Sequence, residues 1–262
     1  MVTRRVLVLG GTAEGRQLAG ALVGLAGVEV VYSIAGRVAA PALPEAARIR
    51  VGGFDGADGL ARYLRSAGVA AVIDATHPYA AVMTRSAVAG CGAAAVPLLV
   101  VRRPGWREAD GDDWHRVPSL AAAAVALDGF GERVFLTTGR SGVAAFAGLD
   151  RHRFLLRSIE APSPPLPARL DVLLERGPFT VDAEVALMRG HRVDVVVTKD
   201  SGGPLTAAKL VAARLLGLPV LVVDRPPVPP GALVAATTRE ALAWVTRLDG
   251  PAGPPGQTGS VT

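Results

Sequence analysis

The segment Val6–Gly15 constrains the fold most, because an apolar strand pattern runs directly into glycines and a helical pattern follows at once. This layout presents backbone N–H groups and a helix N-terminus to a phosphate. Gly10 and Gly15 fit the outer positions of the dinucleotide-binding pattern G-x-G-x-x-G, whereas Thr12 holds the middle position. A side chain at Gly10 or Gly11 would block a pyrophosphate. The alternative is a tight strand-to-helix turn without a ligand.

Composition sets broad limits on the chain. It has 262 residues, 50% of them apolar, which is enough for one or two domains with a sizeable core. The net charge of +5 favours anionic partners, but no run of five basic residues occurs and aromatic side chains are scarce, so we expect no nucleic-acid partner. We find no signal peptide and no apolar run of membrane-spanning length, and we therefore expect a cytoplasmic protein.

Several common chemistries find no support in the sequence. Cys91 is the single cysteine, which excludes an internal disulfide framework and a cysteine-based zinc site. The four histidines show no shared ligand spacing, so we expect no metal. The Tyr-x-x-x-Lys pattern of short-chain dehydrogenases and the Gly-x-Ser-x-Gly nucleophile elbow are also absent.

Strand-like runs alternate with helical patterns along the chain, which predicts an α/β fold with two Rossmann-like parallel-sheet lobes and a ligand cleft between them. We expect a first lobe over 1–103, a second over 104–249 and a disordered tail over 250–262. The segment 102–118 is interpreted as a connection between the lobes. The expected strands are 6–9, 28–33, 49–51, 71–74, 98–101, 134–136, 154–158, 193–198 and 219–223. The expected helices are 14–25, 57–66, 80–90, 120–127, 181–188, 206–216 and 239–248.

The end of the second expected strand bears on the choice of cofactor. A carboxylate there would bind the ribose 2′-hydroxyl of NAD, but none is present. Ser33 and Arg37 suit a 2′-phosphate instead, which favours NADP; the alternative for Arg37 is a solvated loop charge. The turn Gly52-Gly53-Phe54 after the third strand either closes the adenosine side of the site or is only a turn.

A polar cluster, Asp74–Ala80, follows the buried apolar strand that we expect beside the first one. His77 is a candidate acid or a hydrogen-bond donor to a ligand anion, and Pro78 suits the first turn of the next helix. The alternative is a capping role for Asp74 or Thr76, with His77 incidental.

In two segments of the second half, an apolar strand is again followed by polar residues and glycine. Thr138-Gly139-Arg140 follows an apolar strand and could hold an anion, or be a turn with an exposed arginine. Lys199–Lys209 combines basic, hydroxyl and glycine residues at a helix start, which predicts an anion-binding loop. It lacks the Gly-Lys-Ser/Thr end of a P-loop, and a structural Lys–Asp pair is the alternative.

Taken together, these blocks resemble the precorrin-6A reductase family of cobalamin biosynthesis. The resemblance spans residues 4–226 and also includes the Asp-Arg-Pro that ends the segment Leu218–Pro226. It implies two Rossmann-like lobes and NADPH-dependent reduction of the precorrin-6A macrocycle to precorrin-6B. A non-catalytic NADP-sensing regulatory protein on the same fold is the alternative, and an enzyme acting on a nucleotide or sugar phosphate is a third possibility. The oligomeric state, and whether the substrate carries cobalt, stay open.

The resemblance and the motifs together yield three sets of expected site residues. The cofactor-binding set is Gly10, Gly11, Thr12, Glu14, Ser33, Arg37, Gly52, Gly53, Phe54, Asp74, Ala75, Thr76 and Pro78. The set for the polycarboxylate tetrapyrrole is Arg16, Thr138, Gly139, Arg140, Asp200, Ser201, Gly202, Gly203, Thr206 and Lys209. The expected proton donor is Lys199, His77, Tyr79 or water, and the residues do not choose among these.

Overall fold

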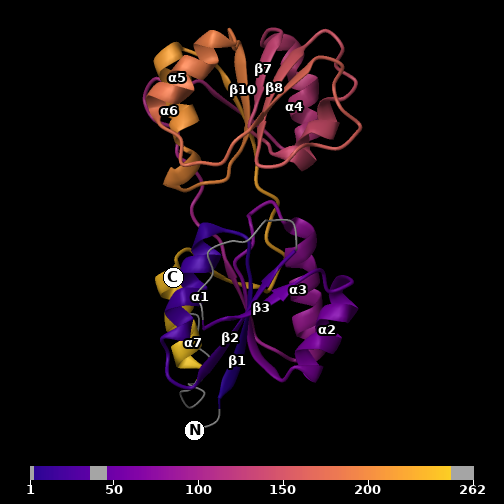
Figure 1. Cartoon of the computed structure of the whole chain (residues 1–262), viewed down its shortest axis with the longest axis vertical. Helices are drawn as coiled ribbons and strands as arrows, with labels where there is room; N and C mark the ends of the chain where they lie inside the picture. Colours follow the sequence, from indigo (N-terminus) through magenta and orange to yellow (C-terminus); the bar gives the residue numbers. More distant parts are fainter. Residues whose placement is uncertain (1–2, 36–45, 249–262) are drawn as a thin grey trace, which may run out of the picture. The chain divides into compact units, whose positions relative to one another are not determined.

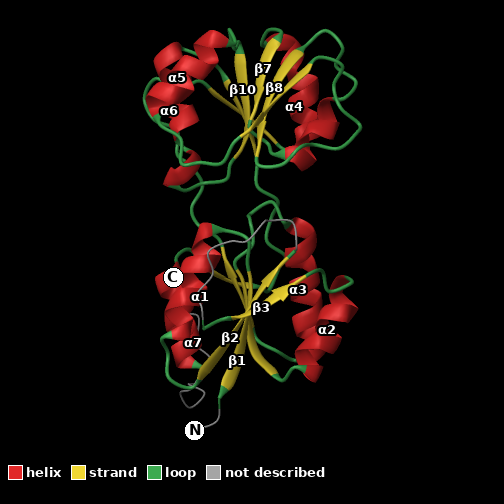
Figure 2. Ribbon diagram, in the orientation of Figure 1, coloured by secondary structure: helices red, strands yellow, loops and turns green. Residues whose placement is uncertain are grey.

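The computed structural model describes residues 3–35 and 46–248 and divides into two compact units. Unit 1 contains the described residues up to Arg103 and those from Pro227 onward, and unit 2 is the continuous segment Pro104–Pro226. Each unit is a six-stranded sheet with helices on both faces, as Figure 1 and Figure 2 show. Every strand pairing recorded in the two sheets is parallel.

Unit 1 has the strand order β12-β5-β4-β1-β2-β3. The four strands inside this sheet are largely buried on both faces, as expected of a parallel sheet between helix layers. Helices α1 and α7 cover one face, and α2 and α3 cover the other. The elements are β1 Arg4–Leu9, α1 Ala13–Val23, β2 Val28–Ile34, β3 Arg48–Val51, α2 Gly56–Ser66, β4 Val69–Asp74, α3 Ala81–Ala94, β5 Leu98–Val101, β12 Leu233–Ala235 and α7 Thr238–Arg247.

Unit 2 has the strand order β6-β11-β10-β7-β8-β9. The elements are β6 Trp114–Val117, α4 Leu120–Ala126, the 3-10 helix η1 Leu127–Gly129, β7 Arg133–Leu136, η2 Arg140–Phe146, β8 Arg153–Ser158, β9 Leu170–Leu174, α5 Val181–Gly190, β10 Val195–Lys199, η3 Pro204–Thr206, α6 Ala208–Leu216 and β11 Val220–Val223. The order of elements from β7 to α7 thus repeats that from β1 to α4, except that η2 stands where the first series has α1 and that η3 is added before α6.

The two units exchange the last strand of each series. β6 follows β5 along the chain but pairs with β11 of unit 2, whereas β12 follows β11 but pairs with β5 of unit 1. In unit 1 the backbone N–H of Arg102 also donates to the carbonyl of Ala235, 2.8 Å away. The chain therefore passes between the units twice, after Arg103 and after Pro226.

The structure confirms the predicted fold class of two parallel-sheet α/β lobes and corrects the expected domain boundaries. The division after Arg103 agrees, but the residues from Pro227 to Leu248, expected in the second lobe, belong to unit 1, because β12 completes its sheet and α7 packs on α1. The segment 102–118, interpreted as a connection, contains β6. The expected tail 250–262 lies outside the described residues. Within the described ranges no helix is both long and apolar enough to cross a bilayer.

Candidate functional site

The glycine turn after β1 is held by long-range contacts. A Cβ on Gly10 would lie 2.1 Å from the Tyr32 ring, so only glycine fits there. The Tyr32 hydroxyl accepts a hydrogen bond of 3.0 Å from the N–H of Gly11, and burial raises the pKa of that hydroxyl. Gly11 has a φ of 116°, and a Cβ on it would meet nothing within 4 Å. Tyr32 therefore holds the turn on one side, and the space that a Gly11 side chain would fill is open.

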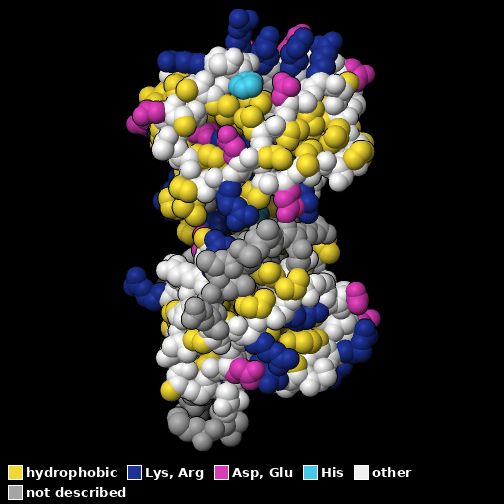
Figure 3. Space-filling model, in the orientation of Figure 1, with side chains coloured by type: hydrophobic (Ala, Val, Ile, Leu, Met, Phe, Trp, Pro, Cys, Tyr) yellow, Lys and Arg dark blue, Asp and Glu magenta, His cyan; other side chains and the backbone are white. Residues whose placement is uncertain are grey.

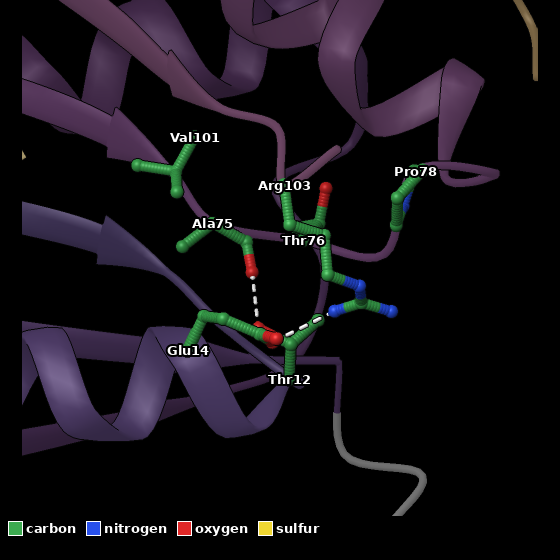
Figure 4. A pocket seen from close by; sticks show the side chains of 7 residues that line it. All are labelled: Thr12, Glu14, Ala75, Thr76, Pro78, Val101 and Arg103. Carbon is green, nitrogen blue, oxygen red and sulfur yellow. Dashed lines mark hydrogen bonds and ion pairs between the residues drawn. The ribbon is translucent and has the colours of Figure 1, made fainter. Parts of the chain in front are cut away.

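Thr12 joins the turn to the start of α1 and to the end of β4. Its Oγ1 accepts from the N–H of Gly15 at 3.0 Å, which caps the helix, and donates to the carbonyl of Ala75 at 2.8 Å. Figure 4 shows these groups around a small pocket at the carboxyl ends of β1, β4 and β5. The pocket is lined by Thr12, Glu14, Ala75, Thr76, Pro78, Val101 and Arg103.

An ion pair lies at this pocket. Arg103 Nη1 is 2.7 Å from the Glu14 carboxylate, and Figure 4 shows the guanidinium reaching across from the end of β5 to the first turn of α1. Glu14 belongs to the expected cofactor-binding set, but Arg103 does not. Its position directly after a strand end of a parallel sheet is the signal that could have identified it.

Asp74 is buried, and its carboxylate accepts hydrogen bonds from the loop that follows β4 and from α3. One carboxylate oxygen accepts from the N–H and the hydroxyl of Thr76, at 3.0 and 2.6 Å, and the other accepts from the Thr84 hydroxyl on α3 at 2.7 Å. None of these contacts caps α3, whose N-cap is Ala80 without a side-chain cap hydrogen bond. They fix the direction in which the loop leaves β4.

His77 and Tyr79 lie together in the same loop. The Tyr79 N–H donates to His77 Nδ1 at 3.3 Å, and the two ring centroids are 5.7 Å apart. Since Nδ1 accepts a hydrogen bond, the proton of a neutral His77 ring is assigned to Nε2. This tautomer presents a hydrogen-bond donor at Nε2.

Ser33 is buried at the end of β2, while Arg37 lies outside the described residues. The basic group found beside Ser33 is Arg50 of β3, whose Nη1 is 3.4 Å from the Ser33 hydroxyl. Arg50 also donates to the carbonyls of Gly52 and Gly53, at 2.7 and 2.6 Å. The sequence reading missed Arg50, because only the pairing of β2 with β3 places it next to Ser33.

In unit 2, two expected anion-binding loops follow the paired strands β7 and β10, so both lie at the carboxyl edge of the sheet. Arg140, after β7, forms an ion pair with Glu160. Thr138 is buried, and its Oγ1 has no hydrogen-bond partner among the described residues. Lys199 ends β10, and burial lowers the pKa of its ammonium group.

Asp200 ties together the two places where the chain enters and leaves unit 2. Its carboxylate accepts from the Trp106 N–H at 2.9 Å and lies 3.6 Å from both Arg116 and Arg225. Arg225 in turn donates to the Asp200 carbonyl at 2.6 Å and to that of Pro104 at 3.1 Å. A Cβ on Gly202 would lie 2.2 Å from the same Pro104 oxygen. Contacts inside unit 2 therefore account for both Asp200 and Gly202.

The expected substrate residues are divided between the two units. Arg16 lies on α1 of unit 1, whereas the other members of that set lie in unit 2. Ser201 and Gly203 belong to the loop after β10, near Trp106, whose indole N–H donates to the Gly203 carbonyl at 2.8 Å. Lys209 is only 3% exposed and donates to the Thr206 carbonyl at 2.5 Å, so it occupies an interior position instead of the expected anion-binding one.

Arginines of unit 2 also gather at the opposite edge of its sheet. Figure 3 shows Lys and Arg side chains along the edge at which β7 and β8 begin, where Arg151, Arg153 and Arg169 are exposed. The positive net charge is thus not concentrated at the carboxyl edge, and charge alone does not locate a site.

The fold and the glycine turn define the class of protein to which unit 1 belongs. A parallel sheet in the order β3-β2-β1-β4-β5-β12, with a glycine turn between its first strand and helix, is that of Rossmann-like nucleotide-binding proteins. Unit 2 repeats the sheet order, and a single glycine, Gly139, follows β7 where the first series has Gly10 and Gly11.

The chain belongs to the family described as precorrin-6x reductase CbiJ/CobK, whose model matches residues 5–246, and the expected resemblance is confirmed. It is 51% identical to a precorrin-6A reductase of Rhodococcus erythropolis, over 93% of this chain and 98% of the relative. It is 46% identical to one of Mycobacterium tuberculosis (strain ATCC 25618 / H37Rv), with the same coverage. A solved structure described as CobK precorrin-6A reductase has a TM-score of 0.86 and 43% identity, over 94% of this chain and 98% of that one.

Proposed function

We propose that the protein reduces precorrin-6A to precorrin-6B in cobalamin biosynthesis, with NADPH as the reductant. The family membership supports the reaction. One observation carries the cofactor assignment: a Cβ on Gly11 would meet nothing within 4 Å, and Gly11 lies at the strand ends where a dinucleotide pyrophosphate binds in this sheet order. NADPH supplies a hydride when bound, and the protein supplies binding and orientation.

Unit 1 holds the nucleotide in this proposal. The N-terminus of α1, capped by Thr12, faces the pyrophosphate, and Ser33 lies at the ribose end. The Arg103–Glu14 ion pair shapes the pocket beside the turn, and the Asp74 contacts fix the loop that carries His77 and Tyr79. The nicotinamide end is assigned to this loop.

The reduction adds a hydride to one atom of a conjugated macrocycle and a proton to another. His77, Tyr79, Lys199 and water stay the proposed proton donors. The lowered pKa of Lys199 makes proton release from its ammonium group easier near neutral pH. The carboxylates of the tetrapyrrole are assigned to Arg140, the Ser201–Gly203 backbone and Lys199 of unit 2.

The test is single-turnover oxidation of NADPH by the purified protein with precorrin-6A, followed by absorbance and by mass of the macrocycle. We expect one NADPH oxidised per macrocycle, faster turnover with NADPH than with NADH, and at least tenfold slower hydride transfer in His77→Asn or Lys199→Met. His191→Asn is the matched control, since His191 is exposed at the end of α5.

Each part of the proposal can fail separately. Tight NADPH binding without oxidation would support a regulatory NADP sensor instead. Equal turnover with NADH would refute the cofactor assignment, and normal rates in both variants would refute the placement of the active loop.

A further inference from the structure

Arg50 is held in a fixed orientation at the carboxyl edge of unit 1. Its guanidinium carbon lies 3.6 Å from the centre of the Phe54 ring, so the two planes pack closely. The carbonyls of Gly52 and Gly53 accept from its two terminal nitrogens. Two backbone anchors and one aromatic face restrict this long side chain, so little rotamer entropy remains to be lost when an anion binds.

The neighbouring hydroxyl completes a pair of donors. Ser33 is 5% exposed, and its Oγ accepts from Arg50 Nη1 at 3.4 Å. Because this oxygen accepts from the guanidinium, its own hydrogen can donate to another group. The pair lies at the end of β2, which is the place in this sheet order where the ribose of a dinucleotide binds.

Unit 2 contains a similar stack of an arginine on a phenylalanine, but its arginine comes from β8, the counterpart of β2, and is paired with a carboxylate. The Arg157 guanidinium carbon lies 3.6 Å from the centre of the Phe179 ring, and Phe179 precedes the N-cap of α5 as Phe54 precedes that of α2. Glu184, four residues after the α5 N-cap, forms a two-pronged ion pair with Arg157 and is buried.

The corresponding position of α2 is Gly59, four residues after the N-cap Asp55. A Cβ on Gly59 would lie 1.6 Å from the Phe54 carbonyl oxygen, so close packing of the turn excludes a glutamate there. Among the described residues, Arg50 has no carboxylate in ion-pair contact. Within the described residues, the cation–aromatic stack is therefore ion-paired in unit 2 and has no carboxylate partner in unit 1.

We infer that Arg50 and Ser33 bind the 2′-phosphate of the adenosine ribose and set the preference for NADPH over NADH. This inference rests on the proposed function and deepens it. A guanidinium binds a phosphate through two parallel N–H···O bonds, while the Ser33 hydroxyl donates a third. NADH lacks the phosphate and gains nothing from either side chain.

The experiment measures kcat/KM for NADPH and NADH, and direct calorimetric binding of 2′,5′-ADP and 5′-AMP. Arg50→Met should lower kcat/KM for NADPH and the affinity for 2′,5′-ADP by about 10- to 100-fold, with NADH and 5′-AMP changed by less than about threefold. Ser33→Ala should show the same selective loss at about 3- to 10-fold. It leaves the Arg50 anchors intact and so remains informative if Arg50→Met disturbs folding.

Arg48→Met is the matched control, because Arg48 is an exposed arginine of the same strand, two residues nearer its start. It should leave all four values unchanged. If the wild type prefers NADPH and both Arg50→Met and Ser33→Ala keep that preference, the inference is overturned while the proposed function stands. If the wild type binds neither dinucleotide, the proposed function itself fails.

Discussion

At the scale of single residues, Lys209 shows how burial changes the chemistry of a side chain. Its ammonium group lies 4.6 Å from the centre of the Trp106 ring and donates to the Thr206 carbonyl. Burial and the charge of Arg157 lower its pKa to about 7, and Glu184 opposes that shift. The cluster holds two basic side chains and one carboxylate, so its extra charge is costly where water is excluded.

This lowered pKa predicts a pH dependence of stability. Between about pH 7 and pH 10.5 the unfolded chain keeps a proton on Lys209 that the folded protein has released, so the free energy of unfolding rises with pH across that window. Denaturant unfolding at pH 7 and pH 9 should give a gain that is about 1–3 kcal/mol larger in the wild type than in Lys209→Met. Equal gains would show that Lys209 titrates normally.

The residues of the candidate site were predictable where the signal is local. The glycine turn at Gly10 and Gly11 and the helix that follows it were predicted from the order of residue types along a few positions, whereas the capping role of Thr12 was not. Tyr32, Arg50 and Arg103 were missed, because each reaches the site through the pairing of strands that are separate in the sequence. Arg37, predicted beside Ser33, lies outside the described residues and stays a prediction.

At the scale of elements, the strands that sequence reasoning missed are β6, β9 and β12, all at sheet edges. The predicted strands include all those flanked by two others, because these are apolar on both faces and read as continuous β-branched runs. In β12, Leu233 and Val234 are exposed and only Ala235 is buried. Three residues after a proline-rich stretch give no periodicity, so the exchange of edge strands could not be predicted.

Helix α7 shows what the exchange contributes to unit 1. Its Val245 and Ala241 are fully buried and belong to the same core cluster as Leu18 and Leu22 of α1. Helix α7 therefore covers a face of the sheet that contains the glycine turn. Without it, the apolar side of α1 would be exposed to water.

A matched pair of substitutions tests this role. Val245→Asp should destabilise unit 1 by about 3 kcal/mol or more, because it places an unpaired charge in the core. Val125→Asp on α4 should change stability by less than about 0.5 kcal/mol, since Val125 is 80% exposed. The measurement is hydrogen exchange resolved by peptide. Protection lost equally in both units would contradict separate cores.

At the scale of the whole molecule, the exchange makes unit 2 an insertion within unit 1. Unit 2 is one continuous segment, and its two ends are held together by the contacts of Arg225 with Pro104 and of Asp200 with Trp106. Unit 1 is assembled from two segments that the pairing of β5 with β12 joins. Each unit has its own sheet and core, as an independently folding domain requires.

This architecture predicts that the units can be separated. Replacing 104–226 with a flexible Gly/Ser linker should leave a cooperatively folding protein that binds NADPH by calorimetry, because the glycine turn, Ser33 and Arg50 all lie in unit 1. It should oxidise no NADPH with precorrin-6A, since the proposed substrate loops are gone. The segment 104–226 expressed separately should fold without binding the nucleotide.

The linker protein also isolates the nucleotide assignment from the rest of the reaction. Introducing Arg50→Met into it should weaken 2′,5′-ADP binding as strongly as in the full chain, because that contact needs no part of unit 2. Nucleotide binding that disappears although the linker protein is folded would mean that unit 2 contributes to the nucleotide site. The sheet order and glycine turn of unit 1 would then be insufficient for binding, and the assignment of the cofactor to unit 1 would have to be withdrawn.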